Sequence, residues 1–563
     1  MITSVNGKSV SPGWLPILVA ICCLFHPASL ATTDRKPPDH LQNGASIDVD
    51  VRKVKKRISP YLRGANVDWP PDGNQVWDST RNRMDPEVMR LARNQGVTLV
   101  RFPGGALVDS YHWHEGIGPV DKRPKQPVVA GGRSVVSLVG IDEILQFCEQ
   151  IGARALLQVN VTSGSSQEAA DLVAYCNQPN NAERRANGHP APYGVKFFEV
   201  GNEQYMAPDP HDKGGALSRL TPVEYARRFV EFAKAMKAVD PTVYVGGIGG
   251  KNADNNYLIK DPRWNETLLR QGGHYIDFLS VHNAYAPVVA VGADRSAEDI
   301  YKAMLAAPVL IAQNLADLRG DVERFAPADA ERIKLAVTEW GPLFHVLPSS
   351  RWVDHAKTLG SALYMASTMN AMIQAPTVDF AAYYKLKDEH FLGTIGLRNI
   401  PKVSYYAMQM YAKHCGPLLL ASTVRSPSYD SLSIGCVAAL KNVPCLDVCA
   451  TTDDAHKHVY FIVVNKSLDS KIEATINLAN FHSATRARTW TLTADAIDAN
   501  NGPDLKDIPF PLSWAKQANA QYSEFENGTP NTVIPLGATI DVAPSFKYIF
   551  PARSITALEF DGL

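Results

Sequence analysis

The sequence lacks an excess of charge of either sign. Its 563 residues include 56 basic and 57 acidic side chains, which gives a net charge of −1. It also has no run of Lys and Arg interleaved with aromatic residues. Nothing in this balance predicts a polyanionic partner, and we expect no nucleic-acid partner. Internal repeats and low-complexity tracts are absent as well.

Long apolar runs are also missing, except near the start of the chain. Lys8 precedes an apolar run from Trp14 to Phe25, and small residues follow up to Ala31. This pattern predicts a secretory signal peptide at 1–31, cleaved after Ala31; an uncleaved anchor is the alternative. No other window reaches about 18 apolar residues, so we expect a secreted or periplasmic protein that leaves the membrane after signal removal.

Cysteine is scarce, with eight residues, of which Cys22 and Cys23 leave with the signal peptide. Cys148 and Cys176 lie in helical patterns and are predicted to be buried thiols. One or two disulfides are expected in an exported protein among the remaining four, which are Cys415, Cys436, Cys445 and Cys449. A zinc site is the rival interpretation, but the chain has no Cys-x-x-Cys pair. We therefore expect no metal and no cofactor.

Two apolar stretches each end in a glutamate, and the chain is organised around them. Residues 195–200 read as a short buried strand that runs into Gly201, Asn202 and Glu203. A second apolar strand begins at Ile333 and ends at Glu339. Buried parallel strands with functional residues at their C-terminal ends are typical of a (β/α)8 barrel. Two such carboxylates suggest glycoside hydrolysis, which uses one acid and one nucleophile or base.

The pattern along the rest of the chain supports this architecture. We predict a (β/α)8 TIM barrel over 59–415 and a C-terminal antiparallel β-sandwich over 416–563, where short alternating strands replace the helical patterns. Residues 32–58 are predicted to be a linker and a strand, centred on Ile47 to Val51, that joins the sandwich. The predicted barrel strands cover 61–68, 98–102, 153–160, 195–200, 243–247, 275–282, 333–339 and 378–386. The predicted helices cover 86–95, 141–151, 166–176, 297–318 and 353–374, and another begins at the capping sequence Thr221 to Glu224.

An ordered set of motifs resembles a known family. They are Arg101-Phe102-Pro103-Gly104-Gly105, Tyr111-His112-Trp113, Gln158-Val159-Asn160, Gly201-Asn202-Glu203, Leu279-Ser280-Val281-His282 and Thr338-Glu339-Trp340. Over roughly residues 60 to 345 the chain is similar to glycoside hydrolase family 51 of clan A, best known for α-L-arabinofuranosidases. The resemblance implies that Glu203 is the general acid/base and Glu339 the nucleophile of a retaining, double-displacement mechanism. Such an acid must stay protonated, and the nucleophile must be ionised and held by donors.

Six further residues are predicted to bind substrate or to orient the two glutamates. By resemblance, Asn202 donates to the sugar 2-hydroxyl, and a turn cap is its alternative role. Arg101 is expected to hydrogen-bond the Glu339 carboxylate, with a structural ion pair as the alternative. His282 and Tyr285 are expected to orient the nucleophile or to line the pocket, although His282 could equally be a satisfied core histidine. Asp68 and Trp340 complete the predicted sugar-binding set.

Three departures from the family pattern concern sugar recognition. Ala106 stands where the family usually has asparagine, so one sugar-binding amide is missing. Asp68 aligns with a usual glutamate and is one methylene shorter. The usual His-x-Tyr is stretched by one residue between His282 and Tyr285. None of these departures affects the pair of glutamates, so they bear on the choice of sugar rather than on the type of reaction.

The expected function is that of an exo-acting α-L-arabinofuranosidase on hemicellulose-type glycans, with an oligo- or polysaccharide as its partner. Another clan A activity (β-xylosidase, β-glucuronidase or endo-β-glucanase) is the main alternative. A non-catalytic carbohydrate-binding protein is the alternative from a different class. A homo-oligomer is compatible with the sequence, which does not specify the oligomeric state.

Overall fold

The computed structural model describes residues 40–128, 134–206, 220–250, 261–289, 295–345, 352–388, 392–502 and 532–563. The predicted signal peptide lies outside this part of the chain. Among the described residues, no helix has the length and apolar content needed to cross a bilayer.

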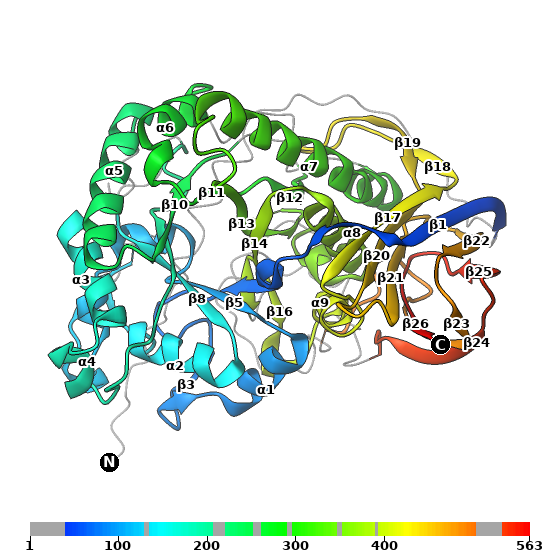
Figure 1. The fold of residues 1–563 in the computed structure, drawn as a ribbon. Helices are drawn as coiled ribbons and strands as arrows, with labels where there is room; N and C mark the ends of the chain where they lie inside the picture. The colour runs from blue at the N-terminus through cyan, green and yellow to red at the C-terminus, as the bar shows by residue number, and fades with distance from the viewer. Residues whose placement is uncertain are drawn as a thin grey trace, which may run out of the picture.

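Eight parallel strands close into a barrel, as predicted (Figure 1). Hydrogen bonds connect them in chain order, and the last strand pairs with the first, Ala382 lying opposite Gly64. A short ninth strand, β12 (Ala284–Pro287), follows β11 and pairs with the second half of β13. The barrel strands are β2 (Gly64–Asn66), β5 (Leu99–Phe102), β8 (Arg154–Val159), β9 (Phe197–Val200), β10 (Tyr244–Ile248), β11 (Phe278–Val281), β13 (Lys334–Leu343) and β14 (Val378–Tyr383).

Helices surround the barrel, and local sequence explains where they begin. Asp85 accepts hydrogen bonds from Glu87 N and Val88 N at the start of α1, and Gly96 ends that helix with a φ of 79°. Thr221 and Glu224 form the predicted capping box of α5. The helices are α1 (Pro86–Gln95), α2 (Ile141–Ile151), α3 (Ser166–Asn177), α4 (Ala182–Ala186), α5 (Pro222–Val239), α6 (Trp264–Gly272), α7 (Ala297–Phe325), α8 (Leu359–Gln374) and α9 (Val403–Lys413).

Two helix predictions differ from the structure in their extent. Helix α7 continues to Phe325, seven residues beyond the prediction, and contains Pro308. The segment predicted as one helix over 353–374 is a 3₁₀ turn, Val353–Lys357, followed by α8. Thr358 separates them because its side chain accepts from Ser361 N and so begins a new helix.

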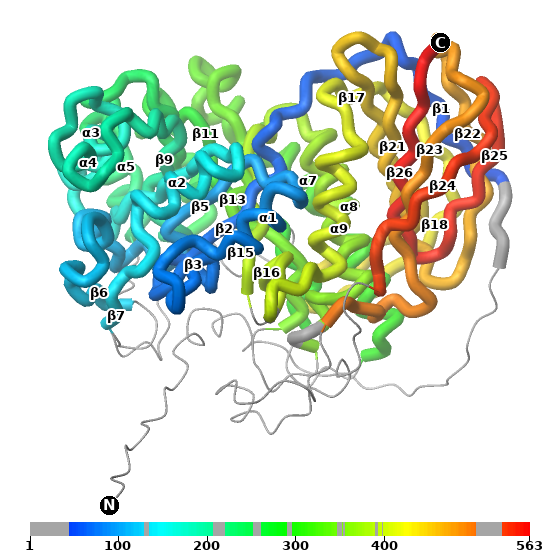
Figure 2. Tube along the Cα trace, turned by 90° about the horizontal axis from the view of Figure 1, so that it is seen from below, coloured from blue at the N-terminus to red at the C-terminus, as the bar shows by residue number. Residues whose placement is uncertain are grey.

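The C-terminal region forms a nine-stranded sheet that includes a strand from the N-terminal end (Figures 1 and 2). Strand β1 (His40–Arg57) lies between β17 and β22 in this sheet. The strand begins at His40, inside the segment predicted as linker. The order is β24 (Leu536–Asp541), β23 (Ser483–Leu492), β26 (Ser554–Gly562), β21 (His458–Asn465), β20 (Leu446–Thr452), β17 (Leu418–Arg425), β1, β22 (Ser470–Ala479) and β25 (Ser545–Phe550).

The predicted antiparallel sandwich is thus one continuous sheet, and β1 runs parallel to β22. Five strands separate the edge strand β25 from β26 in this order. The rings of Phe546 in β25 and Phe560 in β26 are nevertheless only 5.9 Å apart, which shows that the sheet bends around an apolar core of its own. The other face packs against the barrel helices, and Asn370 of α8 donates to Asp447 of β20 at 3.1 Å.

Short two-stranded ribbons lie outside the barrel and the nine-stranded C-terminal sheet. They are β3 (Trp77–Asp78) with β4 (Arg83–Met84), β6 (Lys125–Pro127) with β7 (Ser134–Val136), β15 (Lys385–Lys387) with β16 (Gly393–Ile395), and β18 (Ser428–Ser431) with β19 (Leu440–Pro444).

The cysteines in the described part of the chain are all free thiols. Cys148 and Cys176 are buried, as predicted. The disulfides expected among the last four cysteines are not formed in this structure. The thiols of Cys415 and Cys449 instead share a hydrogen bond, between the end of α9 and strand β20.

Candidate active site

The two glutamates meet at the C-terminal end of the barrel. Glu339 lies within β13, and Glu203 lies three residues beyond β9. Gly201 has a φ of 85° and Glu203 a φ of 44°, so the chain makes two left-handed steps as it leaves the strand. Left-handed backbone is uncommon for a non-glycine residue and is found at functional sites.

His282 links the two carboxylates and fixes how far apart they lie. Its Nδ1 lies 2.7 Å from Glu203 Oε1 and 3.8 Å from Glu339 Oε2, so these two oxygens are at most about 6.5 Å apart. A retaining site requires carboxyl groups separated by roughly 5 to 5.5 Å, and this limit is compatible with that spacing. His282 was predicted to orient the nucleophile or to line the pocket. In the structure it lies near both carboxylates and is closer to Glu203 than to Glu339.

Arg101 is fully buried and connects four side chains around the nucleophile. Its Nη1 lies 3.4 Å from Glu339 Oε2 and 2.9 Å from Asn66 Oδ1. Its Nη2 donates to Asn202 Oδ1 at 2.8 Å, and its Nε donates to Glu199 Oε2 at 2.7 Å. The planar fork of a guanidinium allows all of these contacts at once. Arg101 therefore contacts Glu339, the predicted nucleophile, and also forms a buried ion pair with Glu199, so both interactions that the sequence left open are present.

Asn202 is oriented by this arginine. A guanidinium can only donate, so the amide oxygen of Asn202 faces Arg101 and its NH₂ group is directed elsewhere. The side chain is 2% exposed and immediately precedes Glu203. This orientation provides a donor next to the predicted acid, as the assignment to a sugar hydroxyl requires.

Glu339 is surrounded by donors and positive charge. Burial alone would raise the pKa of its carboxyl group, but the charges of His282, Arg101 and Lys385 and a hydrogen bond from Tyr285 hold the pKa below its ordinary value. Burial and the neighbouring Glu339 raise the pKa of Tyr285 well above its ordinary value, so its hydroxyl stays protonated and remains a donor. A carboxylate kept ionised in this way fits the nucleophile of a glycosidase.

Glu199, which the sequence analysis did not single out, completes the network. It is fully buried in β9, where Ser280 donates to its Oε1, and the Ser280 hydroxyl also contacts that of Thr338. Thr338 Oγ1 in turn lies 3.1 Å from His282 Nε2. A detectable signal existed in the sequence, because Glu199 and Arg101 each interrupt an otherwise apolar buried strand. Buried charges of this kind need a partner.

The opposite side of the site is formed by the ends of β2 and β14. Asp68 is fully buried and binds Lys385 Nζ through Oδ1, while Asn74 Nδ2 donates to its Oδ2 at 3.2 Å. Burial raises the pKa of Asp68, and Lys385 opposes that shift. Gly104, with a φ of 97°, passes so close to Asp68 that a Cβ would lie 2.2 Å from its Oδ1. Lys385 was not predicted, and Asp68 was predicted without its partner.

The remaining predicted residues occupy distinct positions. Tyr285 reaches Glu339 in spite of the extra residue after His282. Ala106 follows Gly105, whose Cβ position would lie 3.7 Å from Glu339 Oε2. Trp340 has no exposed surface and packs edge-on against Tyr383. Its assignment to sugar binding stays a prediction that this placement does not favour.

In the described segments, no group of three or more His, Cys, Asp or Glu side chains is placed to hold a metal ion.

Two family models match the chain. Residues 93–285 match the "Alpha-L-arabinofuranosidase 1 domain" and residues 338–527 match the "Alpha-L-arabinofuranosidase C-terminal domain". The first match contains Arg101, Asn202, Glu203 and His282, and the second begins one residue before Glu339.

Individual proteins agree with these matches. A probable α-L-arabinofuranosidase C of Aspergillus flavus is 26% identical over 466 residues, which cover 77% of this chain and 85% of that protein. An intracellular exo-α-(1→5)-L-arabinofuranosidase of Bacillus subtilis is 24% identical over 467 residues, and the match covers 80% of this chain and 87% of that protein. The crystal structure of a Thermotoga maritima α-L-arabinofuranosidase in complex with arabinose superposes with a TM-score of 0.75 at 25% identity, over 92% of this chain and 100% of the other.

Proposed function

Because this chain belongs to the α-L-arabinofuranosidases of glycoside hydrolase family 51, we propose that it removes terminal α-L-arabinofuranosyl units from hemicellulose-type glycans. It is a retaining glycoside hydrolase, and we assign Glu203 as the acid/base and Glu339 as the nucleophile. The observation that carries this assignment is the pair of carboxylates bridged by His282, of which one is also held by Arg101.

The proposed first step forms a covalent glycosyl-enzyme. The ionised Glu339 carboxylate attacks the anomeric carbon while Glu203 gives its proton to the departing glycosidic oxygen. Arg101 and Tyr285 hold the attacking carboxylate in place. The amide of Asn202 donates to the 2-hydroxyl, a bond that strengthens as positive charge develops on the sugar ring.

The second step releases the sugar. Glu203, now ionised, takes a proton from water, whose oxygen attacks the anomeric carbon and displaces Glu339. His282 contacts Glu203 at 2.7 Å and thereby keeps the acid/base in one orientation through both steps. Two inversions return the original configuration, so the first product formed has the anomeric configuration of the substrate.

Glu339→Ala tests the assignment. We expect kcat on 4-nitrophenyl α-L-arabinofuranoside to fall by about 10⁴-fold or more, as for loss of other enzymic nucleophiles. Glu266→Ala, on the exposed face of α6, is the matched control and should leave kcat unchanged. Unchanged turnover in Glu339→Ala would instead indicate a non-catalytic role for this site.

A panel of nitrophenyl glycosides tests the substrate. Release from the arabinofuranoside, with proton NMR showing retained configuration in the first product, is the expected result. Release only from a β-xyloside, β-glucuronide or β-glucoside would overturn the arabinofuranosidase assignment while leaving the two glutamates in their roles.

We also infer that the chain is exported, on the basis of the apolar run between Trp14 and Phe25 and the small residues before Ala31. The Bacillus subtilis relative is named as intracellular, and the proposal for this chain rests on its own N-terminal residues. Intact-mass measurement of the protein from its own cells should place the mature N-terminus at Thr32. Recovery of a chain that still begins at Met1 would reject export with cleavage at this site.

A further inference from the structure

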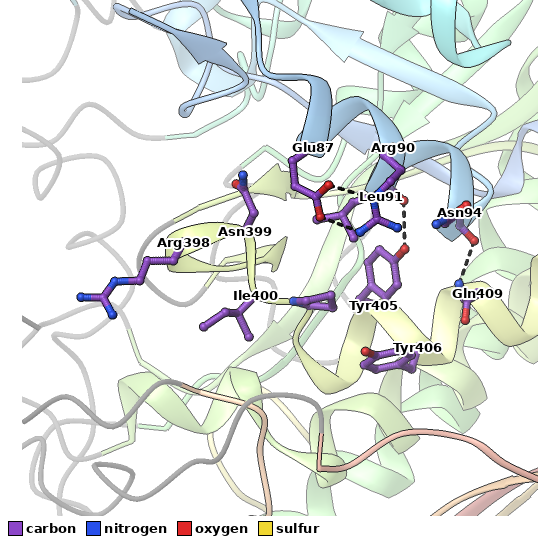
Figure 3. A pocket seen from close by; sticks show the side chains of 11 residues that line it. Glu87, Arg90, Leu91, Asn94, Arg398, Asn399, Ile400, Tyr405, Tyr406 and Gln409 are labelled. Carbon is purple, nitrogen blue, oxygen red and sulfur yellow. Dashed lines mark hydrogen bonds and ion pairs between the residues drawn. The ribbon is translucent and has the colours of Figure 1, made fainter. Parts of the chain in front are cut away.

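A second cavity of about 480 Å³ lies outside the catalytic site, between α1 and α9 (Figure 3). Its walls come from one face along the length of α1, from the segment 398–401 and from α9. This volume is within the range of small-molecule sites. No step of the proposed reaction uses any of the side chains that line it.

The lining combines aromatic rings with neutral polar groups. Tyr405 and Tyr406 contribute rings at 81° to each other, and the Tyr405 hydroxyl is held by Leu91 O at 3.0 Å. Asn94 and Gln409 add side-chain amides, and Gln409 Nε2 donates to the main-chain carbonyl oxygen of Asn94 at 3.0 Å. Figure 3 shows the two rings below α1, with the amides beside them.

The charges in the wall largely compensate each other. Arg90 binds Glu87 in a two-pronged ion pair, with Nε to Oε2 at 2.8 Å and Nη2 to Oε1 at 2.5 Å. Arg398 lies at the outer edge of the cavity in Figure 3 and points away from the tyrosines. The interior therefore suits a neutral ligand that presents both apolar faces and hydroxyl groups. A sugar ring has both, since its C–H face packs on an aromatic ring and its hydroxyls pair with amides.

The cavity lies next to the part of the barrel that carries Asp68 and Lys385. Helix α1 follows β2 and helix α9 follows β14, and these two strands are neighbours. The same two connections carry Asp68 and Lys385 into the active site. The cavity therefore lies on the outer side of β2 and β14, next to the connections that carry Asp68 and Lys385.

We propose that the cavity between α1 and α9 binds a sugar unit of the same polysaccharide whose terminal residue occupies the catalytic site. This inference rests on the proposed function for the identity of the polysaccharide. It gives Tyr406, the more exposed of the two rings, and Gln409 a role in binding the polymer but none in the chemical steps.

The experiment compares a polymer with a small substrate. In Tyr406→Ala and in Gln409→Ala, kcat/KM on arabinan should fall by about tenfold, the loss typical of a well-packed contact residue. Activity on 4-nitrophenyl α-L-arabinofuranoside should not change, because that substrate does not reach the cavity. Tyr275→Ala is the matched control, since Tyr275 is a half-buried tyrosine that precedes β11 and does not line the cavity.

Binding is measured separately from turnover. All proteins in this experiment also carry Glu339→Gln, and they are run through gels that contain arabinan. The protein with the native cavity and the Tyr275→Ala variant should migrate more slowly than the Tyr406→Ala and Gln409→Ala variants. Equal retardation of all of them, or equal loss on both substrates, overturns the inference. If the unmodified enzyme hydrolyses no arabinofuranoside, the proposed function fails, and the gel result still decides whether this cavity binds the polymer.

Discussion

On one side of the active site, residues of β5, β9, β11 and β13 form a continuous polar network that also includes Asn66 of β2. On the other side, the segments that follow β2 and β14 hold one buried ion pair. In the first, which we call the network side, Arg101 joins Glu199, Asn202 and Glu339, and hydroxyl groups connect this cluster to His282. In the second, the ion-pair side, Asp68 and Lys385 hold each other with help from Asn74.

We infer from this difference that the network side serves the chemical steps and the ion-pair side serves recognition of the sugar. On the network side each polar group has several partners, so the loss of one leaves others buried and unpaired at high cost. Such a region holds the nucleophile and the acid/base in a fixed geometry. The ion-pair side has fewer connections, and it includes Asp68, one of the departures from the family pattern. We expect changes there to alter which sugar binds more than how the bond is broken.

Arg101→Met tests the network side and should have the largest effect. It leaves Glu199 buried without its counter-charge, which costs about 3 to 5 kcal/mol of unfolding free energy. It also removes a donor from Glu339 and the orientation of Asn202, so kcat should fall by at least about 10³-fold. Urea unfolding followed by circular dichroism and steady-state kinetics measure the two effects.

Arg101→Lys is the matched control for this change. An ammonium restores the charge opposite Glu199 but cannot make four contacts in one plane, so stability should recover more than kcat does. If Arg101→Met keeps kcat within tenfold of the native value, the network does not hold the nucleophile and the comparison fails.

Asp68→Ala and Lys385→Met test the ion-pair side, with a smaller expected effect. Each leaves one buried charge unpaired, so each should lower stability, and the double variant should regain part of the loss. KM for the arabinofuranoside should rise by about tenfold or more, while kcat stays within a few-fold, because His282, Arg101 and Tyr285 still lower the pKa of Glu339 when the charge of Lys385 is lost. A fall in kcat as large as that of Arg101→Met would show that both sides serve the chemistry.

Tyr285→Phe should have the smallest effect and tests the electrostatics of Glu339. The tyrosine donates to the charged carboxylate and so lowers its pKa; removal of the donor raises that pKa. The acidic limb of the kcat/KM profile should therefore move to higher pH, with activity lost first under acidic conditions. An unmoved acidic limb, with a uniform loss at every pH, would mean that Tyr285 only positions the substrate.

Much of the site was predictable because its residues stand at strand ends. Glu203 and Glu339 follow apolar strands, and parallel strands bring their C-terminal ends together. Arg101 required a buried partner, which the structure provides in Glu199 as well as in Glu339. Lys385 was not predictable in this way, because it lies beyond the end of β14 and its role depends on Asp68, more than three hundred residues earlier in the chain.

The fold was predictable where local signals were strong and less so where pairing is remote. Asp85 and the Thr221–Glu224 capping box marked the starts of α1 and α5. The alternation in Ile47 to Val51 indicated a strand but not the parallel pairing with β22, which depends on contacts across the whole chain. The closeness of Cys415 and Cys449 also depends on tertiary packing, which cysteine spacing alone does not describe.

Strand β1 has a consequence for how the protein is made. Residues 40–57 are synthesised early, but the neighbours they pair with begin at Leu418 and Ser470, so the strand must wait unpaired while the ribosome completes the barrel. The closing sheet then takes in this first segment between two late ones. If the gene were cut at the end of the barrel, the first fragment would carry β1 without its partners, and the second would carry β17 and β22 without β1. Expression of both fragments together is then the arrangement that restores the native sheet.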